Sequence, residues 1–557
     1  MKKSAAAVFI LYVLLYILPL GARPLFIPDE TRYFEIPREM IASGDWVVPR
    51  INGIRYFEKP VLGYWFNAVS MLIFGENAFA VRFPAAMSAG ISALCVFLLA
   101  RRFAGDYSTG ILASVIFLTS AQVLGIGTFS VLDGPLSMLL TVALTVFFFA
   151  YHAEGGAQKR ILLFLAGVFC GLAFLCKGFL AFAVPVLVMI PWMIWEGRFA
   201  ELLKTAWLPL AGAIAVSLPW SLMIHLREGD FWHYFFWIEH VNRFLKPGGG
   251  QHPEAFWFFI PCLLAGLFPW TFLFPAILQG LRDMDISDTL MRFCLCWFIF
   301  PFLFFSASSG KLLTYILPCF PAVAILMAAG LRNYSAKGEN RLFGAGARVL
   351  AVLIGITAIV LLISQITGFT GIRPYDNAGE IWKWILACTG LVLWAFLAFY
   401  SAKEKRPDMR IILFATAPLV FFVSAQFVFP DMVLKRKAPG TLLQKNAGYI
   451  QPGTVVVSDG DIIRAVSAYY KRSDVWFFIT EDELGYGLSY EDAKKRMLDT
   501  EQLNKMIRDA YLSAKKNSQT GSPLVLIART HKYEKYRNRL PQPVYRDEYG
   551  KFVFLQF

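Results

Sequence analysis

Long apolar stretches are the feature that most constrains how this chain of 557 residues folds. About thirteen of them approach the roughly 17 to 25 residues that a helix needs to cross the hydrocarbon layer of a membrane. Because 57% of the residues are hydrophobic, the composition excludes an ordinary soluble protein. We therefore predict an α-helical polytopic membrane protein. The approximate spans are 5–22, 78–100, 108–126, 133–151, 161–176, 178–195, 205–224, 254–280, 290–306, 312–330, 349–366, 381–400 and 411–429.

The short loops indicate the orientation of these spans, because cytoplasmic loops retain Lys and Arg. Lys2 and Lys3 precede the first span, and basic residues such as Arg101 and Lys159 recur in every second loop after it. This pattern predicts a cytoplasmic N-terminus and a C-terminus on the outer side. The basic start and Leu20-Gly21-Ala22 of the first span are also compatible with a cleavable signal peptide, but an uncleaved anchor is favoured because Pro28-Asp29-Glu30 follows immediately and the later loop charges keep the same phase. The basic run 435–437 is an exception to the pattern if the number of spans is odd.

The chain is expected to have two parts. Residues 1–430 form the transmembrane unit, which is interrupted by two outer segments at 23–77 and 225–253, and residues 431–557 form a soluble α/β domain. Within the first outer segment, 31–43 and 61–74 are compatible with helices that lie along the membrane interface with their charges facing water. In the tail, strands are predicted at 454–458, 474–479, 523–528 and 552–555, and helices at 461–470 and 491–516.

Charge and cysteine usage narrow the class of protein further. The net charge of +14 is explained by the asymmetry of the loops and by anionic membrane lipids, so a nucleic-acid partner is not predicted. All eight cysteines lie in or beside predicted spans, which implies neither a disulfide framework nor a zinc–thiolate motif. No GxxxxGKS/T or GxGxxG motif occurs at a strand-to-helix turn, so no nucleotide site is predicted.

Acidic residues near the span ends are candidates for chemistry, because charges at a membrane are usually paired or functional. Asp29 and Glu30, with Arg32 close behind, open the first outer segment; a solvated helix start is the equal alternative. Glu58 lies in the same segment, where an exposed charge pair beside a turn is the alternative interpretation. Asp133 stands before Gly-Pro, and for it an ordinary helix cap is the favoured interpretation.

Four basic residues interrupt the loops that are otherwise poor in Lys and Arg. They are Lys59, Lys177, Arg243 and Lys311, and Tyr315 follows the last of them by about one helical turn. Lys177 has no acidic neighbour in sequence, and the alternative for it is a lysine that reaches the membrane surface. If the four converge, they form a cationic cup able to hold a lipid-linked phosphate.

The second outer segment is rich in aromatic residues and contains four of the six histidines. These histidines are at positions 225, 233, 240 and 252. A metal site is one interpretation, but no HExxH or similarly spaced ligand set is present. Stacked or hydrogen-bonded histidines are therefore favoured over metal ligands.

An ordered set of short motifs resembles a known family. The set resembles the bacterial lipid A 4-amino-4-deoxy-L-arabinose transferases, within the protein O-mannosyltransferase-like group of polytopic glycosyltransferases of the GT-C type. Each motif alone is weak, but their order along the membrane unit is specific for the group. The motifs are Pro28-Asp-Glu-Thr-Arg-Tyr33, Glu58-Lys-Pro60, Leu132-Asp-Gly134, the turn at Lys177, Glu239-His-Val-Asn-Arg-Phe244 and Gly310-Lys-Leu-Leu-Thr-Tyr315.

The resemblance implies an enzyme of the bacterial inner membrane that acts at the periplasmic face. It implies transfer of the aminosugar, with inversion, from an undecaprenyl phosphate carrier to lipid A by a monomer that contacts membrane lipids. Carried over by motif, Asp29 is the acidic catalytic residue, with Glu30 and Arg32 shaping its site. Lys59, Arg243, Lys177 and Lys311 hold the donor phosphate, Asp133 and Tyr315 line the sugar and acceptor cavity, and Glu58 and His240 contact a structural divalent metal such as Zn²⁺.

The predicted chemistry is physically consistent, because fixed cations that grip a leaving phosphate stabilise the transition state more than the bound donor. If the acceptor is a hydroxyl, Asp29 serves as general base; if it is an ionised phosphate, Asp29 orients the acceptor or stabilises positive charge on the sugar. Two alternatives stay open. One is a polyprenyl-phosphate-dependent hexosyltransferase acting on protein or another glycan, and the other is a lipid transporter or flippase, against which no inverted repeat is evident.

Overall fold

The structure is a computed structural model that describes residues 2–104, 106–242, 253–369, 371, 373–479, 482–516 and 524–557. Contacts divide the chain into two compact units. These contacts place segment 23–77 in the same unit as the tail. The predicted domain boundary near residue 430 therefore stays a prediction. The membrane unit comprises Met1–Leu20, Arg82–Arg373 and Trp382–Val428, and the mixed unit comprises Gly21–Val81, Pro374–Ile381 and Phe429–Phe557.

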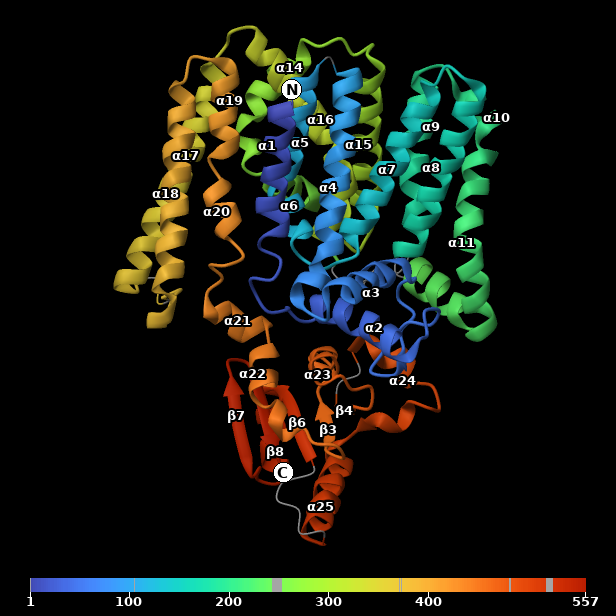
Figure 1. The fold of residues 1–557 in the computed structure, drawn as a ribbon, viewed down its shortest axis with the longest axis vertical. Helices are drawn as coiled ribbons and strands as arrows, with labels where there is room; N and C mark the ends of the chain where they lie inside the picture. Colours follow the sequence, from blue (N-terminus) through green and yellow to red (C-terminus); the bar gives the residue numbers. More distant parts are fainter. Residues whose placement is uncertain are drawn as a thin grey trace. The chain divides into compact units, whose positions relative to one another are not determined.

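Long apolar helices make up the membrane unit and run side by side in Figure 1. In the described part of the chain, nine are long and apolar enough to cross a membrane, which confirms the predicted fold class. Four of the nine consist of two consecutive helical pieces. The nine are α4 (Ala78–Phe103), α7 (Asp133–Tyr151), α8 (Gly156–Lys177), α10 (Phe199–Thr205) with α11 (Trp207–Arg227), α15 (Thr289–Ala307), η5 (Leu313–Cys319) with α16 (Phe320–Ala336), α17 (Arg341–Thr367), η6 (Ala378–Glu380) with α18 (Ile381–Lys403), and α19 (Pro407–Thr416) with α20 (Leu419–Ser424).

Two further apolar stretches are bent, so the number of crossings rises to eleven if each bent pair is one span. The pair α5 (Tyr107–Thr119) and α6 (Ala121–Gly127) bends by 65°. The pair Phe256–Gly266 and Trp270–Arg282, which contains α13 (Phe259–Gly266) and α14 (Phe274–Arg282), bends by 94°. The predicted spans 5–22 and 178–195 appear as shorter helices, Ser4–Ile17 and Leu180–Trp195 (α9). The predicted thirteen crossings are reached only if both of these shorter helices cross the membrane, in addition to the nine long helices and the two bent pairs.

The two bends satisfy each other's polar groups. A break in a membrane helix frees backbone groups that must find partners inside the protein. The N–H of Ala121 donates to the carbonyl of Phe268 at 3.0 Å. The indole Nε1 of Trp270 donates to the hydroxyl of Thr119 at 2.9 Å. These contacts tie the first bend to the second within the membrane unit.

Glycines allow α8 and α11 to approach closely. A Cβ atom added at Gly167 would lie 1.9 Å from the carbonyl oxygen of Pro209, and one added at Gly212 would lie 2.2 Å from that of Phe164. Only glycine fits at either point. This is the small-residue packing that holds membrane helices together where apolar burial gives no advantage over lipid.

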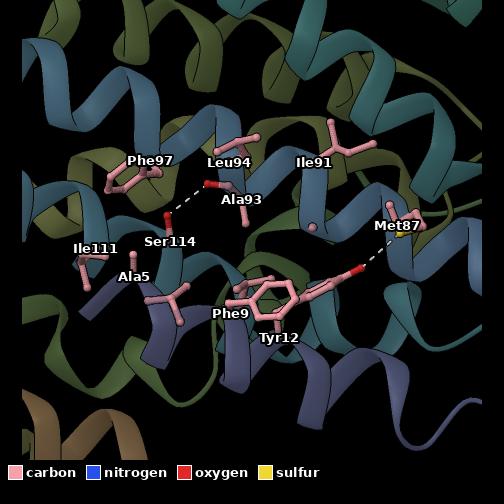
Figure 2. A pocket seen from close by; sticks show the side chains of 13 residues that line it. Ala5, Phe9, Tyr12, Met87, Ile91, Ala93, Leu94, Phe97, Ile111 and Ser114 are labelled. Carbon is pink, nitrogen blue, oxygen red and sulfur yellow. Dashed lines mark hydrogen bonds between the residues drawn. The ribbon is translucent and has the colours of Figure 1, made fainter. Parts of the chain in front are cut away.

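An apolar cavity of about 370 Å³ lies between α1 (Lys2–Tyr12), α4 and α5 (Figure 2). Phe9, Leu94 and Phe97 are among its lining residues. The Tyr12 hydroxyl donates to the carbonyl of Ala86, and the Ser114 hydroxyl donates to that of Ala93. Because its polar groups already have partners, this cavity is not suited to bind a sugar or a phosphate.

A six-stranded sheet forms the centre of the mixed unit, in the order β5-β4-β3-β6-β8-β7. The four predicted strands are present, and β3 pairs in parallel with β4 and β6. Sequence reasoning missed β5, which has two residues, and β7, whose residues are mostly polar. The strands are β3 (Val455–Ser458), β4 (Trp476–Phe478), β5 (Met497–Leu498), β6 (Leu524–Arg529), β7 (Tyr545–Tyr549) and β8 (Phe552–Gln556).

Helices flank this sheet, and α25 buries Leu503 and Ile507 against Leu526 and Leu555. Segment 23–77 adds α2, a short hairpin of β1 and β2, and α3. The elements are α2 (Asp29–Ser43), β1 (Arg50–Ile51), β2 (Ile54–Arg55), α3 (Leu62–Phe74), α21 (Asp431–Lys437), α22 (Gly440–Lys445), α23 (Ile463–Tyr470), α24 (Gly485–Leu488), α25 (Thr500–Lys516) and α26 (Thr530–Tyr536).

The charges of α2 correct one expectation from the sequence. The charges of segment 31–43 were expected to face water, but four of them are buried: Arg32, Glu35, Arg38 and Glu39. The reason is pairing, since buried charges need partners. Arg38 donates twice to Glu35, at 2.7 Å each, and Glu39 accepts the N–H of Gly53 in the β1–β2 turn. Burial dominates at Glu35 and raises the pKa of its carboxyl despite the adjacent Arg38.

Asn52 joins segment 23–77 to the sheet. It is fully buried and lies in the left-handed region with φ of 56°. Its amide donates to the carbonyl of Val475 at 2.7 Å and accepts the N–H of the same residue at 3.0 Å. Arg496 adds hydrogen bonds to the backbone and side-chain oxygens of Asn52. The hairpin turn is therefore held against the chain just before β4.

Candidate active site

The two acidic residues at the start of α2 differ in environment. Glu30 is fully buried and receives Arg23 Nη1 at 2.6 Å, Arg23 Nη2 at 3.2 Å and the N–H of Phe26 at 2.9 Å. The Arg23 guanidinium also lies 4.0 Å from the centre of the Phe26 ring. Glu30 thus fixes the chain where it enters α2. The side chain of Asp29 is 42% exposed, so of the two acids it is the one that a substrate can reach.

Arg32 lies between two carboxylates but is much closer to one of them. Its Nη2 is 2.5 Å from Glu483 Oε2, whereas its Nη1 is 3.8 Å from Asp29 Oδ1. The same Glu483 oxygen lies 3.0 Å from Nη2 of Arg464, a fully buried residue on α23. Burial opposes ionisation of Glu483, but the positive charges of Arg32, Arg464 and Lys59 outweigh it and lower the pKa of this carboxyl. Glu483 is therefore a charged group that balances buried arginines.

Tyr56 connects this cluster to the Glu58-Lys59 pair. Its hydroxyl donates to Glu58 Oε2 at 2.8 Å and lies 3.4 Å from Glu483 Oε2. Lys59 Nζ donates to the carbonyl of Glu58 at 2.9 Å. Burial raises the pKa of Tyr56 well above its usual value, although the Arg32 charge acts the other way, so the phenol stays a proton donor. Segment 23–77 therefore brings Asp29, Arg32, Glu58 and Lys59 into one connected network of charges.

The predicted metal site has no support in the described part of the chain, where no group of three or more His, Cys, Asp or Glu side chains could hold a metal ion. Glu58 is engaged by the Tyr56 hydroxyl instead. His240 belongs to the π-helix His233–Asn242, but its side chain lies outside the described residues. Arg243 also lies outside them.

In the membrane unit, Lys177 and Asp133 form an ion pair. Lys177, the last residue of α8, places its Nζ 2.7 Å from Asp133 Oδ1, and the two side chains are only 12% and 13% exposed. Asp133 is already the first residue of α7, and Leu132 holds the cap position. The favoured interpretation of Asp133 as a helix cap is therefore wrong. Its carboxylate instead pairs with the ammonium group of Lys177, 44 residues away.

Tyr315 completes this second group of predicted residues. Lys177 Nζ lies 5.2 Å from the centre of the Tyr315 ring, a cation–π distance. Asp133, Lys177 and Tyr315 line one small pocket, together with Thr314. The membrane unit therefore brings together both residues predicted for the sugar cavity and one lysine predicted for the phosphate.

Lys311 is buried and its ammonium group is engaged by the backbone. It donates to the carbonyls of Glu254 at 2.8 Å and Ser308 at 2.5 Å. Ser308 is the C-cap residue of α15, where free carbonyls attract a cation. In this structure Lys311 stabilises the helix end and the adjoining chain.

Sequence reasoning missed Glu483, Arg464 and Tyr56. Tyr56 stands two residues before Glu58, and that spacing is a signal that could have been used. Arg464 and Glu483 lie more than 400 residues from Arg32, Arg464 on α23 and Glu483 in the short helix Asp482–Leu484 of the tail. No local pattern marks them, because the pairing arises only when the tail folds against segment 23–77.

Solved structures with a similar fold include that of ArnT from Cupriavidus metallidurans bound to undecaprenyl phosphate. It matches with a TM-score of 0.78 at 22% identity, covering 100% of this chain and 97% of that one. The oligosaccharyltransferase of Archaeoglobus fulgidus in its apo form matches with a TM-score of 0.50 at 14% identity, covering 97% and 70%. These likenesses confirm the predicted class of fold, the polytopic GT-C membrane glycosyltransferase fold.

Sequence comparisons narrow this class to a family. Residues 3–235 match the model of the dolichyl-phosphate-mannose-protein mannosyltransferases, and residues 434–556 match the C-terminal domain of the arabinosyl transferase ArnT. An undecaprenyl phosphate-α-4-amino-4-deoxy-L-arabinose arabinosyl transferase of Shewanella sediminis is 37% identical, covering 99% of this chain and 98% of that one. One from Edwardsiella ictaluri is 38% identical, covering 100% and 99%. The chain belongs to this arabinosyl transferase family, as its motifs predicted.

Proposed function

We propose that this protein transfers 4-amino-4-deoxy-L-arabinose from undecaprenyl phosphate to lipid A. The reaction takes place at the periplasmic face of the bacterial inner membrane, where the tail also lies, and it inverts the anomeric carbon. The observation that carries the proposal is the 37% identity over nearly the full length to a relative named for this donor and this sugar. The network around Asp29, Arg32 and Lys59 supplies the charges that such a reaction needs.

The leaving group is a polyprenyl phosphate, and its negative charge grows as the bond from the anomeric carbon to the phosphate oxygen breaks. Lys59 and Arg243 hold this phosphate and stabilise the developing charge. Asp133, Lys177 and Tyr315 line one small pocket, and the aminosugar and the acceptor bind beside it.

Asp29 acts next to the reacting carbon. The acceptor oxygen forms its bond to the anomeric carbon from the face opposite the departing phosphate. An acceptor that is already an ionised phosphate needs no base, so the Asp29 carboxylate stabilises the positive charge that develops on the sugar ring. Its exposed position at the first turn of α2, beside the buried and fully engaged Glu30, suits this role.

The test uses purified protein in proteoliposomes with labelled aminoarabinosyl undecaprenyl phosphate and lipid A. We expect Asp29→Asn to lower transfer by about 100-fold or more while its affinity for undecaprenyl phosphate stays within about threefold of wild type. Asp408→Asn is the matched control, since Asp408 is also an acid in the first turn of a helix but is 79% exposed. Transfer by Asp29→Asn at the wild-type rate would refute the role of Asp29. Absence of transfer by the wild type, with turnover on another glycan, would refute the acceptor.

A further inference from the structure

The apolar cavity between α1, α4 and α5 is not used by the proposed function. It has a volume of about 370 Å³ and runs along α4 from Met87 to Phe97 (Figure 2). Two of its lining residues reach the surface, since Phe9 is 66% exposed and Leu94 is 55% exposed. The cavity therefore opens on the outside of the membrane unit, where in a bilayer it meets lipid chains.

The lining of this cavity suits a hydrocarbon chain. Its two hydroxyl groups are satisfied inside the protein, because Tyr12 donates to the carbonyl of Ala86 and Ser114 donates to that of Ala93. All the other lining side chains are apolar. A chain that enters the cavity makes dispersion contacts with them and leaves no polar group without a partner.

A cation lies at one end of the cavity. Arg101 is exposed and follows Phe97 by about one helical turn on α4, and its guanidinium lies 5.9 Å from the centre of the Phe97 ring. Ala5 lines the same end of the cavity (Figure 2). Because α1 begins with Lys2 and Lys3 shortly before Ala5, this end of the cavity is basic.

The charge of Arg101 is available to an anion from outside the protein. The next acid along the chain, Asp106, caps α5 by accepting the N–H of Thr109, and it pairs with Arg332 at 3.5 Å. Basic groups beside an apolar pocket between membrane helices are the arrangement that binds anionic lipid headgroups. A lipid with one chain in the cavity would place its phosphate at the mouth, near the guanidinium.

We propose that this cavity binds an acyl chain of an anionic phospholipid, and that the phosphate of this lipid pairs with Arg101. The lipid comes from the leaflet that surrounds this end of α4, and it contacts α1, α4 and α5 together. Phosphatidylglycerol therefore binds more tightly than phosphatidylcholine with the same chains, because only phosphatidylglycerol has a net negative charge. The inference is independent of the proposed function, since no residue of the sugar-transfer site takes part.

The test measures the dissociation constants of the two lipids for the full-length protein in detergent micelles by native mass spectrometry. We expect phosphatidylglycerol also to raise the unfolding temperature more, since a ligand that binds only the folded state stabilises it. Arg101→Gln should weaken phosphatidylglycerol binding by about fivefold and leave phosphatidylcholine binding unchanged. Arg102→Gln is the matched control, since Arg102 is also exposed but lies against the rings of Phe103 and Phe149, which do not line the cavity.

A second variant tests the cavity itself. Leu94→Trp places a larger side chain in the cavity and should weaken the binding of both lipids by about tenfold or more, since the chain loses most of its buried apolar area. The variant is expected to fold, because Leu94 is more than half exposed. Leu98→Trp is its matched control, since Leu98 is on the same helix and 39% exposed but does not line the cavity.

Three results would overturn the inference. Equal binding of the two lipids by the wild type would show that the charge of the headgroup is not recognised. Undiminished phosphatidylglycerol binding by Arg101→Gln or by Leu94→Trp would place the lipid elsewhere. Displacement of phosphatidylglycerol by a lower concentration of undecaprenol, which carries no charge, would assign the cavity to an isoprenoid chain.

Discussion

Replacing Lys177 and Asp133 singly and together measures whether their ion pair is structural or binds the donor. The Nζ and Oδ1 atoms are 2.7 Å apart, and each side chain is about nine-tenths buried. At an effective dielectric constant of about 20, the attraction at this distance is about 6 kcal/mol, and the desolvation of both charges opposes it. Removing one partner leaves a buried charge alone, at a cost of about 3–5 kcal/mol.

We therefore expect Lys177→Met and Asp133→Asn each to lower the free energy of unfolding by about 3 kcal/mol, the lower end of that range, because a tenth of each side chain reaches solvent. The double variant carries no charge in the pocket and should lose about 1 kcal/mol. The coupling energy of the double-mutant cycle is then several kcal/mol. Denaturant unfolding in mixed micelles measures the free energy of unfolding of the wild type, the two single variants and the double variant.

Binding of undecaprenyl phosphate distinguishes a structural role of the Lys177–Asp133 ion pair from a role in donor binding. Because Asp133 neutralises Lys177, we expect the double variant to bind undecaprenyl phosphate within about threefold of wild type. Loss of a lysine that holds the phosphate would weaken binding by about tenfold or more. Lys159→Met is the matched control, since Lys159 pairs with Glu201 at a more exposed site and should cost no more than about 1 kcal/mol. A double variant with restored stability but weakened binding would refute our reasoning and place Lys177 on the phosphate.

Two further predictions concern packing. Asn52→Ala removes both hydrogen bonds to Val475 and places alanine at φ of 56°. We therefore expect the free energy of unfolding of the mixed unit to fall by about 2–4 kcal/mol in thermal unfolding. An unchanged unfolding temperature would contradict this. Gly167→Ala places a methyl group 1.9 Å from the Pro209 carbonyl and should separate α8 from α11, which lowers stability in detergent and shortens the lifetime of activity on heating. Gly156→Ala, with no atom within 4 Å of the new Cβ, is its control, and equal stability of the two variants would refute the packing argument.

The spans could be predicted because length and apolar composition decide them almost alone. Residues 133–151 were predicted and found as one helix, and 78–100 falls inside the helix Ala78–Phe103. The bends at Ser120 and near Pro269 were not predicted. Both depend on contacts between distant segments, such as the Trp270 indole with the Thr119 hydroxyl, which no local pattern reveals.

The candidate site was predictable only in part. Motif order singled out Asp29, Lys59, Asp133 and Lys177, but it could not say how they pair. Lys177 has no acidic neighbour in sequence, yet a carboxylate 44 residues away neutralises it. The charges of segment 31–43 were expected to face water because the segment was predicted to lie along the membrane interface. Pairing to groups on other elements buries it instead, and a periodicity argument for one helix contains no information about those partners.

The contacts of the mixed unit argue against treating the C-terminal domain as a separable module. Glu483 neutralises the buried Arg32, and Val475 satisfies both polar groups of the buried Asn52 side chain. A chain cut after residue 430 would remove the shortest ion pair of that arginine and both hydrogen bonds between that amide and Val475. Each loss costs more than a surface contact can recover. Segment 23–77 therefore depends on the tail for its own fold, and the residues that carry the proposed chemistry on α2 depend on it too.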